Sequence, residues 1–444
     1  MMRHNLSPME MPIEGDMQTR KSTWKSPTSY GCALAIVVLL AIAVTRSAQA
    51  QTFSVIHTFA GGQDGASPRA GLTIDAGGNL YGTTYSGGAG GNGTVYKLTR
   101  TGSSWILNPV YSFAGGNDGA GPFGGMVFGP NGSIYGTTRS GGGGSGCQVY
   151  DYTGCGTIFD LAIPPNAICG TAPCPLTENV LYRFSGGSDG AHPAQGDLNF
   201  DRAGNIYGAT YQGGSSGCGT VFKLTRSGSG WTEGVLYAFT GAIDGCFAHA
   251  VTFDQVGNLY GTAITAGAHG LGTVFQLSPS GSGWVENTLY SFQGGTDGQE
   301  PVAGVIFDGS GNMYGSTVHH GQGGGGTVFE LTPSGGGWTF STIYGLSGSG
   351  SGPQATLMDQ AGSLYGTTFS DGAHGLGSVF KLTPSGGGTW TYTSLYDFTG
   401  GSDGANPYSN LVFDASGNLY GTTSAGGTGL ACSGGCGVVF EITP

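Results

Sequence analysis

The tripeptide Leu/Ile/Met-Tyr-Gly recurs seven times in the 444 residues of this chain. Successive tyrosines are 54, 72, 53, 54, 51 and 55 residues apart. A near-constant period of this length indicates a repeat architecture, because each unit is one supersecondary element that buries its apolar face only against its neighbours. The tyrosines are Tyr81, Tyr135, Tyr207, Tyr260, Tyr314, Tyr365 and Tyr420.

Each repeat has the pattern of four short strands. In the first unit we expect strands over 71–75, 80–84, 94–99 and 105–113, separated by glycine-rich and polar turns. No stretch after residue 50 shows a helical period. Four antiparallel strands in a repeat of about 50 residues are typical of one blade of a β-propeller. The sequence therefore predicts an all-β, seven-bladed β-propeller.

The two ends of the predicted domain, residues 51–444, complement each other. The last unit stops at its third strand, 437–444, and residues 53–59 resemble the fourth-strand ending of other units, such as 288–292. We therefore expect the N-terminal strand to complete the last blade and close the ring. A β-solenoid is the alternative, although it would need polar capping repeats rather than a split unit.

Residues 1–50 have the pattern of a signal peptide with a long n-region. The apolar run 31–44 has 14 residues, whereas a membrane span needs about 20. Arg20, Lys21 and Lys25 precede the run, and a small-x-small cleavage site ends at Ala50. We expect cleavage there and secreted or periplasmic residence; an uncleaved N-terminal anchor is the alternative. Initiation at Met17 would give an ordinary leader.

The charge balance excludes several partner classes. Without residues 1–50 the chain carries 9 basic and 23 acidic residues, a net charge of −14. Such a surface argues against nucleic acid and anionic membranes as partners. We expect a monomer with no cofactor and no membrane span in the mature chain.

Eight of the nine cysteines follow the leader, and an even number in an exported chain favours disulfides. Cys147 and Cys155 share one loop, and so do Cys432 and Cys436. Cys218 and Cys246 lie in neighbouring loops, so they form a third candidate pair. Cys169 and Cys174 flank the insertion that lengthens the second interval to 72 residues.

Two aspartate positions repeat. The first, Asp-x-x-Gly-Asn/Ser, is typical of a side chain that caps its own turn; its members are Asp75, Asp201, Asp254, Asp308, Asp359 and Asp414. The second is Asp-Gly between blades, where calcium binding is an alternative to turn chemistry because carboxylates are hard oxygen ligands. Its members are Asp64, Asp118, Asp189, Asp244, Asp297 and Asp403.

Histidines gather in loops predicted to share one face. His269, His319, His320 and His374 lie between the second and third strands of their blades, and His192 and His249 lie between blades. They are candidates for a metal site or a general base. The alternative is that they are ordinary exposed loop residues. The sequence contains no Gly-x-Ser-x-Gly motif, no phosphate loop and no Rossmann fingerprint.

The repeat unit resembles the GloVer (Gloeobacter/Verrucomicrobia-type) tandem repeat. Residues 403–413, 414–423 and 437–443 show its consensus well, and the resemblance covers nearly all of 53–444. It implies a bacterial exported protein, often with a C-terminal surface anchor, and no established activity. The chain ends at Pro444 without an apolar tail, which favours free secretion or periplasmic residence.

These features lead to three functional expectations. The first is a non-enzymatic propeller that binds a glycan or a protein through its loop face. The second is a secreted lyase or hydrolase with a histidine-containing site there, which rests on analogy between propellers alone. The third is a structural envelope protein.

Overall fold

The computed structural model describes residues 51–444 except 145, 150–151, 163–175 and 349–351, with 148, 149, 152 and 354–357 described by their backbone. Contacts divide the chain into residues 1–50 and 51–444. The predicted signal peptide, Cys169 and Cys174 therefore lie outside the described residues. Within the described ranges, no helix is long and apolar enough to cross a membrane.

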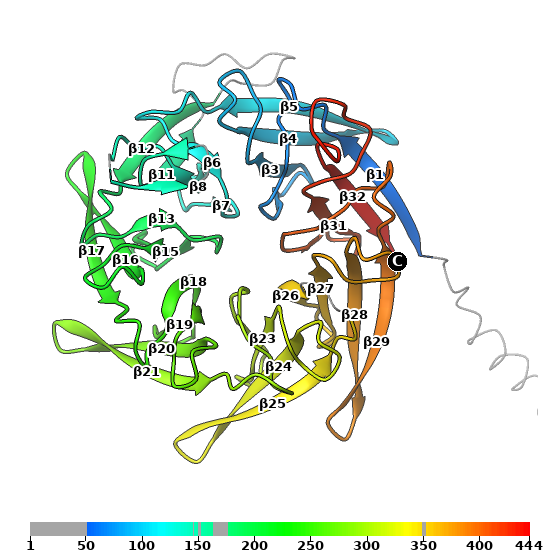
Figure 1. The fold of residues 1–444 in the computed structure, drawn as a ribbon. Helices are drawn as coiled ribbons and strands as arrows, with labels where there is room; N and C mark the ends of the chain where they lie inside the picture. Colours follow the sequence, from blue (N-terminus) through cyan, green and yellow to red (C-terminus); the bar gives the residue numbers. More distant parts are fainter. Residues whose placement is uncertain (1–50, 145, 150–151, 163–175, 349–351) are drawn as a thin grey trace, which may run out of the picture. The chain divides into compact units, whose positions relative to one another are not determined.

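Residues 51–444 form a ring of seven antiparallel sheets, which confirms the predicted seven-bladed propeller (Figure 1). Blades are numbered along the chain. Blade 1 contains β2 (Thr73–Ile74), β3 (Leu80–Thr84), β4 (Thr94–Thr101) and β5 (Ser104–Ser112). Blade 2 contains β6 (Ala120–Pro122), β7 (Val127–Phe128), β8 (Ile134–Ser140), β11 (Thr157–Ala162) and β12 (Thr177–Arg183), with the hairpin β9 (Gln148–Val149) and β10 (Tyr152–Thr153) in its β8–β11 loop.

The remaining blades follow the same order from the centre outward. Blade 3 contains β13 (Ala191–Pro193), β14 (Asn199–Phe200), β15 (Ile206–Gln212), β16 (Thr220–Ser227) and β17 (Gly230–Ala238). Blade 4 contains β18 (Cys246–Phe253), β19 (Leu259–Thr265), β20 (Thr273–Ser280) and β21 (Gly283–Ser291). Blade 5 contains β22 (Ile306–Phe307), β23 (Met313–Thr317), β24 (Thr327–Ser334) and β25 (Gly337–Gly345). Blade 6 contains β26 (Pro353–Met358), β27 (Leu364–Thr368), β28 (Ser378–Gly386) and β29 (Thr389–Asp397).

Blade 7 is built from both ends of the described chain. It contains β30 (Val412–Phe413), β31 (Leu419–Thr423), β32 (Val438–Thr443) and β1 (Thr52–Thr58). The outer strand β1 pairs with β32 from Thr52↔Thr443 to Thr58↔Val438. Figure 1 shows blue β1 beside red β32. The prediction that the N-terminal strand completes the last blade is confirmed.

In six of the seven blades the repeated aspartate and tyrosine form one hydrogen-bonded unit in the hairpin between the first two strands, whereas blade 2 has Gly129 in place of the aspartate. In blade 1, Asp75 Oδ1 accepts hydrogen bonds from the backbone N–H groups of Gly77 and Asn79, both at 2.9 Å. The Tyr81 hydroxyl donates to Asp75 Oδ2 at 3.2 Å. These bonds satisfy turn donors that would otherwise need water. The structural reading of this aspartate position is confirmed.

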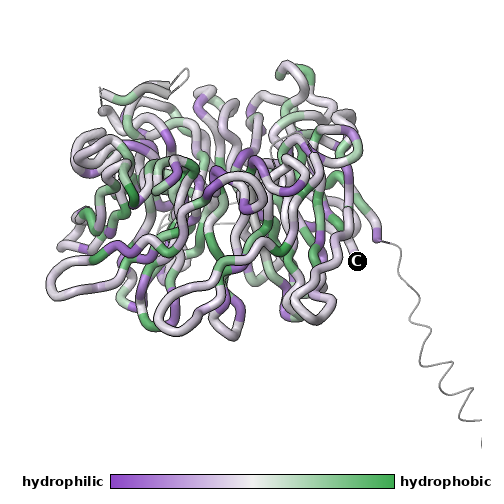
Figure 2. Tube along the Cα trace, turned by 60° about the horizontal axis from the view of Figure 1, so that its bottom comes forward, coloured by the Kyte–Doolittle hydropathy of each residue, from purple (hydrophilic) through white to green (hydrophobic). Residues whose placement is uncertain are grey.

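The tyrosine rings pack between blades. Tyr81 meets Phe128 of blade 2 edge to face at 5.5 Å, and Tyr420 of blade 7 meets Trp105 of blade 1 at 5.8 Å. The glycine after the tyrosine leaves room for the third strand, because a Cβ at Gly315 would overlap the ring of Phe329. Hydrophobic residues, drawn green, lie mainly along the blades, and residues of intermediate hydropathy, drawn pale, occupy most hairpin tips (Figure 2). The core therefore lies within and between the blades.

Two sets of loops meet on one face. In blade 1 the loop that enters the blade bridges the loop after its second strand through Ala66↔Ser86. Gly88 N also donates to Gly62 O at 2.8 Å. We call this side the loop face. It carries the predicted histidine and inter-blade aspartate positions and six of the predicted cysteines, Cys147, Cys155, Cys218, Cys246, Cys432 and Cys436.

Candidate functional site

The inter-blade aspartates make hydrogen bonds within their own loops. Asp189 Oδ2 accepts from Ser185 N at 2.7 Å and from the Tyr182 hydroxyl at 3.0 Å. Asp244 repeats this arrangement with Thr240 N and Tyr237 at 2.7 and 3.0 Å. Across the described part of the chain, no three His, Cys, Asp or Glu side chains are grouped to hold a metal ion. The predicted calcium role thus gains no support from these contacts.

The predicted histidines are dispersed over the loop face. His269, His320 and His374 are exposed in the loops of blades 4, 5 and 6. His319 lies 3.7 Å from Glu300, as an isolated partly exposed pair. His192 and His249 instead lie on the central side of blades 3 and 4, in β13 and β18. Of the predicted set, His249 lines the cavity described below, and His192 contacts the backbone of Arg139 beside it.

The three candidate disulfides that lie within the described residues are present. Cys147–Cys155 and Cys432–Cys436 each close one loop, and Cys218–Cys246 joins the β15–β16 loop of blade 3 to the start of β18 in blade 4. These three pairings are confirmed. The bridges restrain loops on the loop face. They thereby reduce the entropic cost of ordering these glycine-rich segments.

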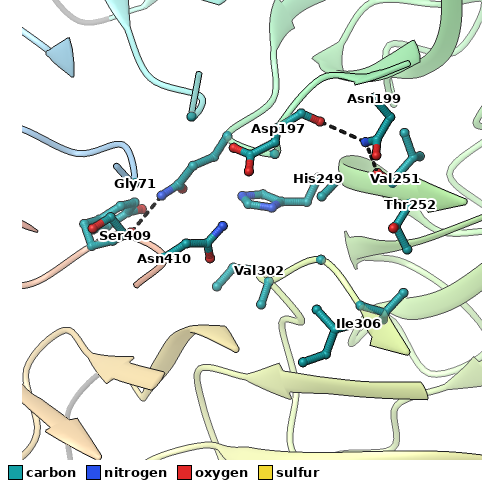
Figure 3. A pocket seen from close by; sticks show the side chains of 18 residues that line it. Gly71, Asp197, Asn199, His249, Val251, Thr252, Val302, Ile306, Ser409 and Asn410 are labelled. Carbon is teal, nitrogen blue, oxygen red and sulfur yellow. Dashed lines mark hydrogen bonds between the residues drawn. The ribbon is translucent and has the colours of Figure 1, made fainter. Parts of the chain in front are cut away.

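The inner ends of the blades surround a central cavity of about 190 Å³ (Figure 3). Its polar side chains include Asp197, Asn199, His249 and Asn410. Gln195 reaches across the ring from blade 3, because its Nε2 donates to Tyr408 O of blade 7 at 2.9 Å and to Arg69 O of blade 1 at 3.5 Å. Elsewhere the lining is mostly glycine, alanine and valine, so a few polar groups determine its chemistry.

Asp197 lies against a gap left by blade 2, since a Cβ at Gly125 would overlap its Oδ1. The side chain is enclosed by protein on most sides, yet it keeps partial access to solvent through the cavity. Desolvation raises the pKa of Asp197 to about 6, while the hydrogen bond from the Gly125 backbone lowers it. Its carboxyl is therefore an acceptor at neutral pH and turns partly into a donor in mild acid.

His249 is 8% exposed, and its Nδ1 has no hydrogen-bond partner among the described residues. Burial, together with the charge of Arg139, lowers the pKa of His249 to about 3. The imidazole is therefore neutral at physiological pH, with one nitrogen available in a polar cavity. A carboxyl, a neutral imidazole and two amides suit hydroxyl-bearing ligands.

Arginines and aromatic rings border the cavity on the loop face. We call this set the arginine–aromatic rim: Arg69, Tyr85, Phe123, Arg139, Tyr211, Phe247, Phe369 and Tyr408. Arg69 Cζ lies 4.3 Å from the Tyr85 ring centroid, and Arg139 Cζ lies 4.8 Å from Phe123 and 5.3 Å from Tyr211.

The rim is continuous from blade 6 to blade 4. Tyr211 and Phe247 stack in parallel at 4.6 Å, with an interplanar angle of 10°. On the other side, Tyr408 contacts Phe123 at 5.8 Å and Phe369 at 5.4 Å. Tyr408 also lines the cavity, so the rim and the cavity form one candidate site.

Left-handed residues shape the loops that carry the rim. The residue entering the inner strand has φ of 52° at Ser67, 54° at His192 and 65° at Phe247. Non-glycine residues rarely adopt this conformation, which costs on the order of 1 kcal/mol or more each. At the second of these positions His192 Nδ1 lies 2.8 Å from Arg139 O. The strained loop thereby contacts the segment that carries Arg139.

Reasoning from the sequence missed the rim. Its members occupy three repeat positions: four residues after the repeated tyrosine, the positive-φ residue that enters the inner strand (Phe247), and the residue two places later (Arg69, Phe123 and Tyr408). The first of these positions holds Tyr85, Arg139, Tyr211 and Phe369 but also Ile264, Val318 and Ser424. The sequence signal that could have identified the rim is this variation between blades, because the residues differ while the adjacent Gly-Thr-Thr segment is repeated.

Comparisons with known proteins agree with the fold. The extracellular domain assigned to a hybrid two-component system of B. thetaiotaomicron matches with a TM-score of 0.52 and 11% identity over 89% of this chain and 42% of that chain. A domain assigned to a one-component system of the same organism matches with a TM-score of 0.53 and 8% identity over 87% and 39%. The chain thus spans about two fifths of the length of these structures. At such identities the likeness shows the fold alone.

The sequence comparisons identify the repeat itself. No curated protein matches the chain. The Gloeobacter/Verrucomicrobia repeat matches three times, over residues 42–167, 153–288 and 282–444. These matches contain all seven tyrosines of the recurring tripeptide and the hairpin aspartates that their hydroxyls contact. The chain belongs to the Gloeobacter/Verrucomicrobia repeat family.

Proposed function

We propose that this protein is an exported, non-enzymatic propeller that binds a glycan at the arginine–aromatic rim and the central cavity beneath it. The observation that carries the proposal is the rim itself. Flat aromatic faces and fixed cationic groups converge at one place in a molecule whose other loops are rich in glycine.

Sugar rings have apolar faces and polar edges, and the site offers a complement to each. The stacked pair Tyr211 and Phe247 is partly exposed and presents ring surface. The cavity offers acceptors and donors at Asp197, His249 and Asn410. Concave sites with apolar walls and a few placed polar groups are typical of small-molecule binding.

Export is supported by the disulfides. Three bridges among the described residues indicate an oxidising compartment, because cytosolic thiols are kept reduced. Extracellular or periplasmic glycans would be accessible to such a protein.

A glycan array followed by calorimetry on the purified protein tests the proposal. We expect binding to at least one oligosaccharide class, and we expect Phe247→Ala to weaken it about tenfold or more through loss of stacking. Val256→Ala is the control, since Val256 is 84% exposed in a hairpin on the opposite face. Wild-type affinity in the Phe247→Ala variant with unchanged folding would contradict the proposed site.

The other functional expectations correspond to other results of the same experiment. Shortening of the bound oligosaccharide would indicate a lyase or hydrolase. A blank array together with pull-down of a specific envelope protein would indicate a protein ligand or a structural role. Metal analysis of the same sample tests the calcium alternative.

A further inference from the structure

We propose that the glycan bound at the rim is acidic, and that Arg139 and Arg69 hold its oxyanion while the central cavity binds neighbouring hydroxyls. This inference rests on the proposed glycan-binding function and specifies its ligand class. The shared ligand chemistry is a sugar that carries a carboxylate or a sulfate.

The placement of positive charge is the first argument. Only 9 of the residues after position 50 are basic, against 23 acidic ones. Most of the other cations contact repeated aromatic residues within the blades. Lys97 and Lys223, for example, lie over Tyr81 and Tyr207 at 5.2 and 5.3 Å. Arg69 and Arg139 are instead the two cations of the rim, where they contact Tyr85, Phe123 and Tyr211.

The lack of a carboxylate partner is the second argument. Within the described ranges, neither Arg69 nor Arg139 forms an ion pair, whereas Arg100 approaches Glu441 at 3.8 Å and Lys223 approaches Asp201 at 4.0 Å. The buried Nε of Arg139 also has no hydrogen-bond partner there. Buried donors are nearly always paired in folded proteins, so this unpaired Nε shows that the protein does not use all the donors of the Arg139 guanidinium, which leaves the group available to an oxyanion ligand.

The packing of the guanidinium groups is the third argument. Arg139 lies between Phe123 and Tyr211, and Arg69 lies over Tyr85 and within 6.0 Å of Phe123. Contact with ring faces restrains a guanidinium while leaving its N–H edge able to form paired hydrogen bonds with an oxyanion. Such preorganisation reduces the ordering cost of binding.

The cavity explains why the anion belongs to a sugar rather than to a small inorganic ion. Asp197 would repel a free anion within the cavity above its pKa of about 6. The same carboxylate accepts hydrogen bonds from hydroxyls, and Asn410 and neutral His249 can do likewise. Cationic groups at the rim and acceptors below it therefore match a ligand with one acidic and several hydroxyl groups.

Calorimetry with matched oligosaccharides tests the inference. The probes are uronate oligomers (galacturonate, glucuronate and mannuronate), methyl-esterified forms of the same length, sulfated galactan oligomers and neutral galactan oligomers. We expect an acidic class to bind and to lose about 10- to 100-fold in affinity on esterification or in Arg139→Gln. The uronate and sulfated arms show which oxyanion is preferred.

Two variants separate the guanidinium from net charge and from folding. Arg202→Gln removes the same charge from an exposed hairpin on the opposite face, and we expect wild-type affinity. Arg139→Lys keeps the charge without the paired donors, and we expect an intermediate loss with unchanged thermal unfolding. If only neutral glycans bind, and equally well to Arg139→Gln, the inference is wrong while the proposed function stands. If no glycan binds, both are wrong.

Discussion

One position of the outer strand differs between two halves of the ring. It lies opposite the last apolar residue of the third strand, as in the register pairs Leu161↔Glu178 and Leu331↔Phe340. Blades 2, 3 and 4 carry Glu178, Glu233 and Glu286 there, whereas blades 5, 6 and 7 carry Phe340, Tyr392 and Phe53.

In the aromatic half this side chain stacks on a tyrosine of the preceding blade. Phe340 lies 3.9 Å from Tyr290 with an interplanar angle of 5°, and Phe53 lies 3.6 Å from Tyr396 at 7°. Tyr392 and Tyr344 repeat the arrangement at 4.9 Å. These contacts bury apolar area between blades and do not depend on protonation.

In the acidic half the glutamate interacts with the aspartate of the loop before its blade, and that aspartate accepts a hydrogen bond from a tyrosine in the outer strand of the preceding blade. Burial, followed by the charge of Asp118, raises the pKa of Glu178 from 4.5 to about 8. Burial and the charge of Asp189 raise the pKa of Glu233 to about 7. Burial raises that of Glu286 to about 6, with a contribution from Asp244. The same interface thus depends on pH in one half of the ring only.

The sign of this dependence follows from linkage. A carboxyl whose folded pKa is raised binds its proton more tightly in the folded state, so its contribution to stability is complete below the unfolded pKa of 4.5. That contribution is lost as pH rises towards the folded pKa, which is about 8 for Glu178. The buried histidines act in the opposite direction, because burial lowers the pKa values of His192 and His249 below 6.5.

The largest effect is expected from placing a glutamate at this position in the aromatic half. Phe340→Glu removes the stack on Tyr290 and places a carboxyl beside Asp297, whose Oδ2 accepts from Tyr290 at 2.7 Å. We expect a loss of about 2–3 kcal/mol in the free energy of unfolding at pH 8, and less at pH 5 where the new carboxyl is protonated. Denaturant unfolding at the two pH values measures the difference.

Phe340→Tyr is the matched control, because Tyr392 occupies the equivalent position in blade 6. We expect it to change stability by less than about 0.5 kcal/mol. An equal loss in both variants would show that the site tolerates no change at all, and the comparison between the halves would fail.

A smaller effect of opposite sign is expected in the acidic half. Glu178→Gln removes a carboxyl that Asp118 and Asp160 disfavour in its charged form, although Arg183 offsets part of this. We expect a gain on the order of 1–2 kcal/mol at pH 8.5, reduced by solvent screening, and almost none at pH 5. Subtracting the wild-type curve at each pH cancels the histidine contributions. A gain that is the same at both pH values would exclude titration of Glu178 as the cause.

The sequence predicted the features that repeat and missed those that depend on neighbours in space. Seven tyrosines and a split last unit were enough for the ring and its closure, because period and strand length are local properties. Asp75 was correctly assigned to its turn for the same reason. Three disulfides followed because the loops that carry them are adjacent in any propeller.

The candidate site was not predictable in this way. His269, His320 and His374 lie in the equivalent loop of their blades, yet these are three different blades and the side chains are exposed. Arg139 became informative only once Phe123 and Tyr211 were placed around it. The raised pKa of Glu178 likewise depends on Asp118, which is 60 residues earlier in the chain. A site built from several blades can be predicted only when the strand register and the arrangement of the blades in the ring are known.

The smallest effect is expected from placing an aromatic side chain at this position in the acidic half. Glu233→Phe would place a ring over Tyr182, as Phe340 lies over Tyr290. We expect a gain of about 0.5–1 kcal/mol at pH 8 from stacking and lost carboxyl repulsion. Glu233→Leu separates the two causes, because Leu107 occupies the equivalent position in blade 1 and offers apolar area without a ring. If both variants gain equally in thermal and denaturant unfolding, removal of charge explains the difference between the halves and stacking adds nothing measurable. A larger gain for phenylalanine would show that ring stacking itself stabilises the contact between blades.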